Sequence, residues 1–230
     1  MAKRRYDQYC ALARALDVVG ERWTLLIVRE LILGPRRYTD LLGALPGIGT
    51  NLLADRLTSL EREGIVERDR LPPPAAAAVY ALTEYGRGLE PAVIALTRWG
   101  SRRLRQPSRS DHFRPSWLGI AMLAAFRPGV ATDVRATYEF EIGGEVLNAH
   151  VEDGELEVRQ GHAEDPDFTF KTDAATLRRI LSGRLTLIDA VAHEKARLVG
   201  DRAALMRFEE LFGLTERALE PASAALPSSP

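Results

Sequence analysis

Hydrogen-bonding side chains open a short amphipathic segment in the first third of the chain. Thr50 and Asn51 follow a turn with one proline and two glycines, and the segment ends at Gly64. Leucines recur through it at four- and three-residue spacing: Leu53, Leu57 and Leu60. This spacing predicts a helix with one buried stripe and with Thr50 or Gly49 as its N-cap. An asparagine amide can donate and accept at once, which suits the edge of an adenine base; the alternative is an ordinary helix with a solvated polar face.

Arginines on both sides of this segment are candidates for contacts to phosphate groups. Arg36 and Arg37 stand at the start of a second predicted helix, residues 39–45, where the positive end of the helix dipole disfavours them. A nearby phosphate would relieve that repulsion, and surface solubility is the equally weighted alternative. With the polar residues above, the predicted nucleic-acid surface comprises Arg36, Arg37, Tyr38, Thr39, Thr50, Asn51, Ala54, Arg56, Arg68 and Arg70.

Sequence signatures of catalysis and of metal binding are missing. The chain has no Gly-x-Ser-x-Gly nucleophile elbow and no Walker-type phosphate loop. The histidines, which lack the spacing of metal ligands, are His112, His150, His162 and His193. The pair His193-Glu194 is followed by Arg197 where a zinc-binding helix needs a second histidine. We therefore expect a protein that is not an enzyme, with no catalytic residue, no metal and no cofactor.

The secondary structure predicted around Thr50 and Asn51 indicates how the fold exposes these two side chains. An apolar face from Trp23 to Ile32 indicates a helix that ends at Gly34-Pro35. The 39–45 helix, the glycine turn and the helix from Thr50 follow, and then two short strands, residues 65–70 and 79–83, around a Pro/Ala-rich loop. Helix, turn, helix and β-ribbon in this order form a winged helix-turn-helix, which places one helix in the major groove of DNA.

A dense set of residues links the first hundred positions to a known family. These residues are Cys10, Gly20, Arg22–Ile27, Arg29–Leu31, Leu33–Tyr38, Leu45–Ile48, Arg56-Leu57, Gly64–Arg68, Tyr80–Thr83 and Trp99-Gly100. With them the chain resembles the HxlR family of bacterial winged-helix transcription regulators. The resemblance implies a homodimer that binds two-fold-related operator sites on double-stranded DNA. It also implies dimer contacts from the helix around residues 12–19 and from a long helix over residues 84–104.

Three departures limit what this resemblance implies about the site. The family usually opens the recognition helix with Ser-Pro and then a lysine, whereas this chain has Gly49-Thr50-Asn51, so the operator cannot be copied from relatives. An arginine usually precedes the second strand of the wing, and here that position falls in the run Ala75–Ala78, which leaves Arg68 and Arg70 as substitutes. The third departure is the long extension beyond residue 105.

Cys10 is the one cysteine, and some HxlR relatives sense oxidants or electrophiles through a cysteine at this position. The neighbouring Lys3, Arg4 and Arg5 would lower the pKa of the thiol if they fold close to it. The resemblance makes Cys10 a candidate redox sensor, although we expect a buried structural thiol. A single cysteine also gives no internal disulfide, which fits a cytoplasmic protein.

Charge divides the chain into two halves. Residues 1–110 hold 18 Lys and Arg against 12 Asp and Glu, a net +6, whereas residues 111–230 hold 13 against 20, a net −7. The basic half contains the predicted helix-turn-helix, as phosphate binding requires. We predict a DNA-binding and dimerisation domain at 1–105, a linker at 106–114, a second domain at 115–217 and a flexible tail at 218–230. No apolar run is long enough to predict a membrane span.

The second half changes to the period of β-strands. Alternating residues predict strands at 137–142, 147–151, 155–159 and 167–171, with turns at Gly143-Gly144 and Asp153-Gly154. Helices are expected at 174–181, with Asp173 as N-cap, and at 185–192 and 203–212. The predicted fold class is α+β: a winged helix-turn-helix domain followed by an antiparallel sheet covered by helices.

Several short motifs in this half also point to a family. They are Phe168–Asp173, Leu181–Gly183 and Leu198–Asp201, with Leu205, Phe208 and Leu211. Over about residues 116–214 the chain resembles the sterol-carrier-protein type of lipid-binding domain. The resemblance implies an apolar tunnel between sheet and helices that holds a hydrophobic small-molecule effector, or else a domain that serves only for dimerisation. Residues apolar enough to line a pocket, each of which is alternatively simple core, are Trp117, Met122, Phe126, Tyr138 and Phe140.

Overall fold

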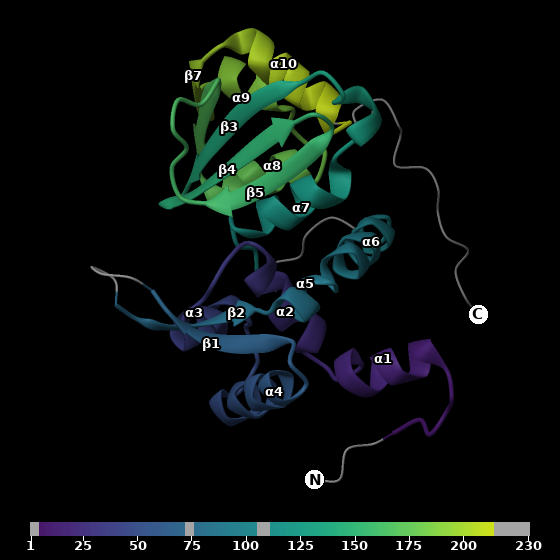
Figure 1. Cartoon of the computed structure of the whole chain (residues 1–230). Coiled ribbons are helices and arrows are strands. Elements are labelled where there is room, and N and C mark those ends of the chain that lie inside the picture. The colour runs from purple at the N-terminus through teal and green to yellow at the C-terminus, as the bar shows by residue number, and fades with distance from the viewer. Residues whose placement is uncertain (1–4, 72–75, 105–110, 214–230) are drawn as a thin grey trace, which may run out of the picture. The chain divides into compact units, whose positions relative to one another are not determined.

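The computed structural model describes residues 5–71, 76–104 and 111–213 (Figure 1). Contacts between residues divide the chain into two compact units, 1–96 and 97–230. Each unit has its own hydrophobic core. The predicted tail at 218–230 and most of the predicted linker lie outside the described residues.

The N-terminal unit is a set of short helices around a two-stranded ribbon. Its elements are α1 (Ala11–Val19), α2 (Thr24–Ile32), α3 (Tyr38–Ala44), α4 (Thr50–Arg62), β1 (Val66–Arg70), β2 (Ala78–Leu82), α5 (Glu84–Arg87) and α6 (Glu90–Ser101), which runs across the boundary into the second unit. The ribbon is antiparallel, from the pair Val66↔Leu82 to the pair Arg70↔Ala78. The predicted order of helix, turn, helix and ribbon is confirmed.

The leucine stripe of α4 is the part of this unit that fixes the helix. Leu53, Leu57 and Leu60 are at most 2% exposed, and α4 packs on β1. Together these three side chains contribute roughly 5–9 kcal/mol of apolar burial, at about 1.5–3 kcal/mol each. The rest of the core comes mainly from α2 and α3, through Ile27, Val28, Leu31 and Leu41, and from Leu45 directly after α3.

The turn between α3 and α4 depends on a glycine. Gly47 has a φ of +92°, a region that side chains other than glycine rarely adopt. A Cβ at this position would lie 3.7 Å from the ring of Trp23, so the indole packs directly against the turn. Gly49 is the N-cap of α4, which settles the choice between Gly49 and Thr50.

The predicted continuous helix over residues 84–104 is wrong. The structure has two helices there, α5 and α6, separated at Gly88 and Leu89. Gly88 caps the end of α5. Pro91 lies in the first turn of α6 and has no backbone N–H, so it cannot donate the helical hydrogen bond to the carbonyl oxygen of Arg87. A prediction based on the spacing of apolar residues alone does not detect these two breaks in the helix.

The C-terminal unit is a five-stranded sheet with helices. Its elements are α7 (Trp117–Ala125), the 3₁₀ turn η1 (Pro128–Val130), β3 (Arg135–Ile142), β4 (Glu145–Glu152), β5 (Glu155–Gln160), β6 (Phe168–Thr172), α8 (Ala174–Leu181), α9 (Leu187–Ala192), β7 (Ala196–Gly200) and α10 (Arg202–Leu211). The strand order is β5-β4-β3-β6-β7. The α+β class and the predicted strands and hairpin turns are confirmed.

The sheet is mixed, so the prediction of a wholly antiparallel sheet needs one correction. β6 pairs with β3 in parallel, from Tyr138↔Phe168 to Ile142↔Thr172, while the other three pairs are antiparallel. The connection after β5 carries the chain past the β3–β4–β5 meander and inserts β6 beside β3. Local alternation predicts a strand but not which neighbour it chooses.

Alternation gives the sheet one apolar and one polar face. Tyr138 on β3 stacks on Phe168 of β6 at 5.0 Å between ring centroids, and Phe208 of α10 meets the Tyr138 ring edge-on at 5.2 Å. Figure 1 shows α10 beside this face of the sheet. On β3, Glu139 and Glu141 alternate with Tyr138 and Phe140. The two glutamates therefore point to the opposite face of the sheet. Among the described residues, the aromatic core therefore lies on the Tyr138 face of the sheet.

Side-chain caps start α8, α9 and α10. Asp173 Oδ1 accepts from the backbone N–H of Thr176 at 2.7 Å, as predicted, and Thr186 Oγ1 accepts from that of Asp189 at 2.9 Å. Asp201 caps α10 in the same way. Each cap of this kind contributes about 1 kcal/mol.

Gly86→Ala should destabilise the N-terminal unit. A Cβ at Gly86 would overlap the carbonyl oxygen of Ile65, a backbone atom that cannot rotate away. We expect a loss of about 1–3 kcal/mol, the usual effect of overpacking. Urea unfolding of the full chain, followed by tryptophan fluorescence, measures it. Gly100→Ala is the matched control, since a Cβ there has nothing within 4 Å. Equal midpoints for the two variants would contradict the expectation.

Candidate nucleic-acid interface

The first turns of α4 present a small polar surface. Thr50, Asn51 and Ala54 are exposed, while Leu53 between them is fully buried. Because the leucine stripe faces the core, these three side chains project outward from the start of the helix. This is the arrangement that the sequence predicts for a helix that reads bases.

Tyr38 holds this end of α4 in place. Its hydroxyl donates a hydrogen bond to the carbonyl oxygen of Thr50 at 2.7 Å, which joins the start of α3 to the start of α4. Thr39, the next residue, is exposed. Tyr38 therefore fixes the exposed start of α4, and Thr39 lies on the accessible side of α3.

Arg36 and Arg37 have different surroundings. Arg36 is half-buried, and its backbone pairs with Tyr80 of β2 through two hydrogen bonds of 2.9 and 2.7 Å. Its Nε also donates to the carbonyl oxygen of Glu30 at 3.3 Å. Arg37 is exposed and caps α3, where the carboxylate of Asp40 accepts from its backbone N–H at 3.2 Å. The guanidinium of Arg37 is thus more accessible than that of Arg36.

Arg56 and Arg68 are engaged in ion pairs. Arg56 Nη2 lies 2.9 Å from Glu21 Oε2, which links α4 to the segment before α2. Arg68 on β1 donates to Glu61 of α4 at 2.7 Å and lies over the ring of Tyr80 at 5.5 Å. The hydrogen bond to Glu61 raises the pKa of Arg68. Both arginines therefore brace α4 against its neighbours.

Arg70 is the exposed arginine at the end of the first wing strand. Its Nε reaches the carbonyl oxygen of Ala76 at 3.5 Å, across the base of the wing loop. Ala75, at the predicted wing tip, lies outside the described residues. Within the ten-residue surface predicted from sequence, the exposed members are Arg37, Thr39, Thr50, Asn51, Ala54, Arg68 and Arg70.

Cys10 is exposed, so the expectation of a buried thiol is wrong. It is the N-cap of α1, and the backbone N–H groups of Ala13 and Leu12 at the start of the helix lower the pKa of its thiol. The start of α1 supplies this effect. Lys3 and Arg4 lie outside the described residues.

The five residues considered for a hydrophobic pocket lie in or beside the core of the C-terminal unit. Met122, Tyr138 and Phe140 are buried, and Trp117 and Phe126 are half-buried. Tyr138 is 0% exposed, and its hydroxyl has no hydrogen-bond partner among the described residues. Burial raises the pKa of this phenol to about 12. An unpaired buried hydroxyl is unfavourable by roughly 1–3 kcal/mol unless a further group binds it.

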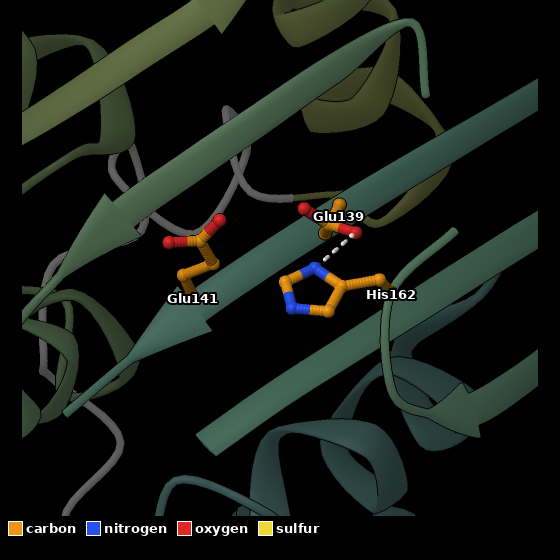
Figure 2. Close-up of side chains that lie close together, drawn as sticks. All are labelled: Glu139, Glu141 and His162. Carbon is orange, nitrogen blue, oxygen red and sulfur yellow. Dashed lines mark hydrogen bonds and ion pairs between the residues drawn. The ribbon is translucent and has the colours of Figure 1, made fainter. Parts of the chain in front are cut away.

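A second cluster lies on the polar face of the same sheet, and the histidine spacing gave no sign of it. Figure 2 shows the side chains of Glu139 and Glu141 on β3 close to the imidazole of His162. One possible ligand atom from each residue lies within 4.8 Å of the others. His162 comes from the connection between β5 and β6, so the three residues meet only because β6 returns beside β3.

The fold and the exposed start of α4 define the class of protein: a winged-helix, DNA-binding transcriptional regulator. Residues 18–108 match the model of the HxlR-like helix-turn-helix family, and residues 126–213 match that of the SCP-2 sterol transfer family. The chain belongs to the HxlR-like helix-turn-helix family, and an SCP-2 domain follows the helix-turn-helix domain in the sequence. No catalytic family is indicated, and across the described residues no helix is long and apolar enough to cross a membrane.

Three curated relatives align with the N-terminal part of the chain. The uncharacterized HTH-type transcriptional regulator sll1512 of Synechocystis is 40% identical over 43% of this chain and 73% of its own length. YvaP of Bacillus subtilis, also an uncharacterized HTH-type regulator, is 35% identical over 38% of this chain and 82% of its own length. The HTH-type transcriptional regulator YodB of the same organism is 35% identical over 38% and 79%.

The thiol of Cys10 should react with iodoacetamide at a lower pH than an ordinary cysteine. Because the folded state lowers its pKa, the reactive thiolate persists as the pH falls through the unfolded value. The alkylation rate, measured against pH by mass spectrometry, should have a lower midpoint in the native protein than in the urea-unfolded chain. Coincident midpoints would show that the start of α1 does not stabilise the thiolate.

Proposed function

We propose that the protein binds operator DNA as a homodimer and that a hydrophobic small molecule in the C-terminal domain regulates this binding. The carrying observation is the exposed start of α4, where Thr50, Asn51 and Ala54 project from a helix whose other face is buried. In this account Asn51 contacts an adenine edge and Ala54 allows close approach or meets a thymine methyl group.

The contacts to phosphate groups fall to the arginines that the fold leaves accessible. Arg37 at the start of α3 and Arg70 on the wing are exposed, and the N-terminal half carries a net +6. We assign Arg36, Arg56 and Arg68 to holding the elements together, because the first two are half-buried and Arg68, although exposed, is paired with the carboxylate of Glu61. This division separates residues that contact DNA from residues that position the contacts.

Exposed apolar side chains on α1 and α6 support the homodimer. Leu12 and Leu16 on α1 are 67% and 37% exposed, and Leu96 and Trp99 on α6 are 50% and 61% exposed. Large apolar side chains that gather on a helix in this way favour burial against another chain. A second copy would bring two α4 helices to a two-fold-related operator.

The effector is proposed to bind between the sheet and the helices of the C-terminal domain. The apolar face there is rich in aromatic rings, and the buried hydroxyl of Tyr138 offers one polar contact. A ligand that binds one arrangement of the dimer better than another shifts the population toward it, which changes the spacing of the recognition helices. The alternative is a C-terminal domain that only stabilises the dimer.

Cys10 supports a second way of regulating DNA binding, through oxidants or electrophiles. Its exposure and the lowered pKa of its thiol favour reaction with oxidants or electrophiles. If Cys10 has this role, peroxide or a quinone releases DNA from the wild-type protein but not from the Cys10→Ser variant. Equal release from both would remove Cys10 from the account.

Replacing Arg37 by Ala should weaken binding to all DNA sequences and reduce the salt dependence. Loss of one phosphate contact lowers the slope of log K against log salt concentration by about 1. Arg56→Ala is the comparison: it breaks the pair with Glu21, so it should lower the melting temperature and leave the slope unchanged. Fluorescence anisotropy with one labelled duplex at several salt concentrations gives both slopes. An unchanged slope for Arg37→Ala would remove this residue from the DNA surface.

Native mass spectrometry of the freshly purified full chain tests the dimer and the effector together. We expect a dimer that carries a hydrophobic molecule, which denaturation then releases for identification. An empty dimer would favour the purely structural role of the C-terminal domain. A monomer at all concentrations would contradict the homodimer.

A further inference from the structure

We infer that Glu139, Glu141 and His162 form a binding site for one zinc-type divalent cation on the polar face of the C-terminal sheet. The site is independent of the proposed effector, because it lies on the opposite side of β3 from Tyr138 and Phe140. It is also separate from the N-terminal unit that carries α4.

The topology brings the three side chains together. Glu139 and Glu141 are two residues apart on β3, so both point to the same face. The β5–β6 connection turns at Gly161, whose φ is +101°, and places His162 over Glu139. In Figure 2 a dashed line joins the imidazole to the carboxylate of Glu139, and the carboxylate of Glu141 lies near both; one ligand atom from each residue lies within 4.8 Å of the others.

The distance between His162 and Glu139 fits a shared metal better than a strong hydrogen bond. Nδ1 of His162 lies 3.3 Å from Oε2 of Glu139. A charge-assisted hydrogen bond between such groups is usually about 2.7–2.9 Å long. Two ligands at about 2.0–2.1 Å from a tetrahedral zinc ion are themselves separated by about 3.3 Å. The nitrogen and the oxygen therefore already stand at the spacing of two zinc ligands, and Glu141 offers a third ligand atom within 4.8 Å of both.

Glu139 is held in a fixed orientation. It is 4% exposed, its Oε2 accepts from the backbone N–H of Ala163 at 2.8 Å, and its Oε1 accepts from the hydroxyl of Thr169 at 3.3 Å. A carboxylate has about four acceptor positions, so these bonds leave capacity for a metal. Hydrogen bonds of this kind orient metal ligands in known sites. The fold therefore pre-orients one ligand of the three.

Lys171 is the competing cation. Its Nζ lies 2.6 Å from Oε1 of Glu141, where the ammonium neutralises the carboxylate. The lysine side chain is 42% exposed, so it can turn into solvent when a doubly charged ion takes its place. Removing this ammonium should therefore strengthen metal binding.

The ligand set selects the class of metal. One imidazole and two carboxylates suit Zn²⁺, whereas Mg²⁺ and Ca²⁺ prefer oxygen ligands alone. A bound ion would tie the β5–β6 connection to β3. The expected consequence is a more stable C-terminal domain when zinc is present.

The test is a zinc titration of the full chain against a chromophoric chelator. The protein carries no affinity tag and contains Cys10→Ser, which removes the thiol as an alternative ligand. We expect one zinc per chain, with at least a ~10-fold loss of affinity in His162→Ala and in Glu141→Gln. Lys171→Met should bind zinc more tightly. His193→Ala is the matched control, because this exposed histidine at the end of α9 lies outside the cluster.

Thermal unfolding with and without zinc gives a second reading. Zinc should raise the melting temperature of the parent and of His193→Ala but not of His162→Ala. Circular dichroism checks that His162→Ala is folded. Zinc binding that is equally strong in His162→Ala and His193→Ala would overturn the proposal. Absence of stoichiometric binding in the parent would overturn it as well.

Discussion

The direction that α4 faces depends on the burial of three leucines. Leu53, Leu57 and Leu60 are almost fully enclosed, and α4 cannot turn without exposing them. A rotation that brought this stripe to solvent would lose roughly 5–9 kcal/mol, a large fraction of the stability of a typical domain. The outward position of Asn51 is therefore a consequence of core packing. The hydrogen bond from Tyr38 and the ion pairs of Arg56 and Arg68 then refine the position of a helix already fixed by its apolar side.

The same constraint acts on the C-terminal sheet with a different period. Successive residues of a strand point to opposite faces, so the aromatic positions of β3 and β6 form one face and the positions between them form the other. One strand thus supplies Tyr138 to the apolar interior and Glu139 to the polar surface. A ligand in the interior and an ion on the surface can be bound by neighbouring residues without sharing a contact.

Local patterns predicted those parts of the structure that depend on local interactions. The stripe of α4, the cap at Asp173 and the turn at Asp153-Gly154 each arise from residues a few positions apart, and each was predicted from the sequence. The neighbour of β6 was not predicted, because strand pairing depends on the path of the whole chain. The break between α5 and α6 was missed because apolar spacing outweighed Gly88 and Pro91.

The candidate sites follow the same division. The exposed start of α4 could be predicted from residue types and helical period. The partners of Arg56 and Arg68 could not, since Glu21 and Glu61 are distant in sequence or on another element. His162 was set aside on spacing, and only the return of β6 beside β3 brings its ring over Glu139. Burial of Cys10 was expected from its residue type, whereas its place at the start of α1 leaves it exposed.

The most direct test of the central claim is the affinity of Asn51→Ala for DNA. A duplex enriched by the wild-type protein from a random pool, and a scrambled duplex of equal length, are titrated with both proteins at one salt concentration. The account predicts a loss of about 1–3 kcal/mol on the enriched duplex and none on the scrambled one, because a base contact carries sequence specificity. Equal affinities of the two proteins for the enriched duplex would contradict the assignment of α4 as the helix that reads DNA.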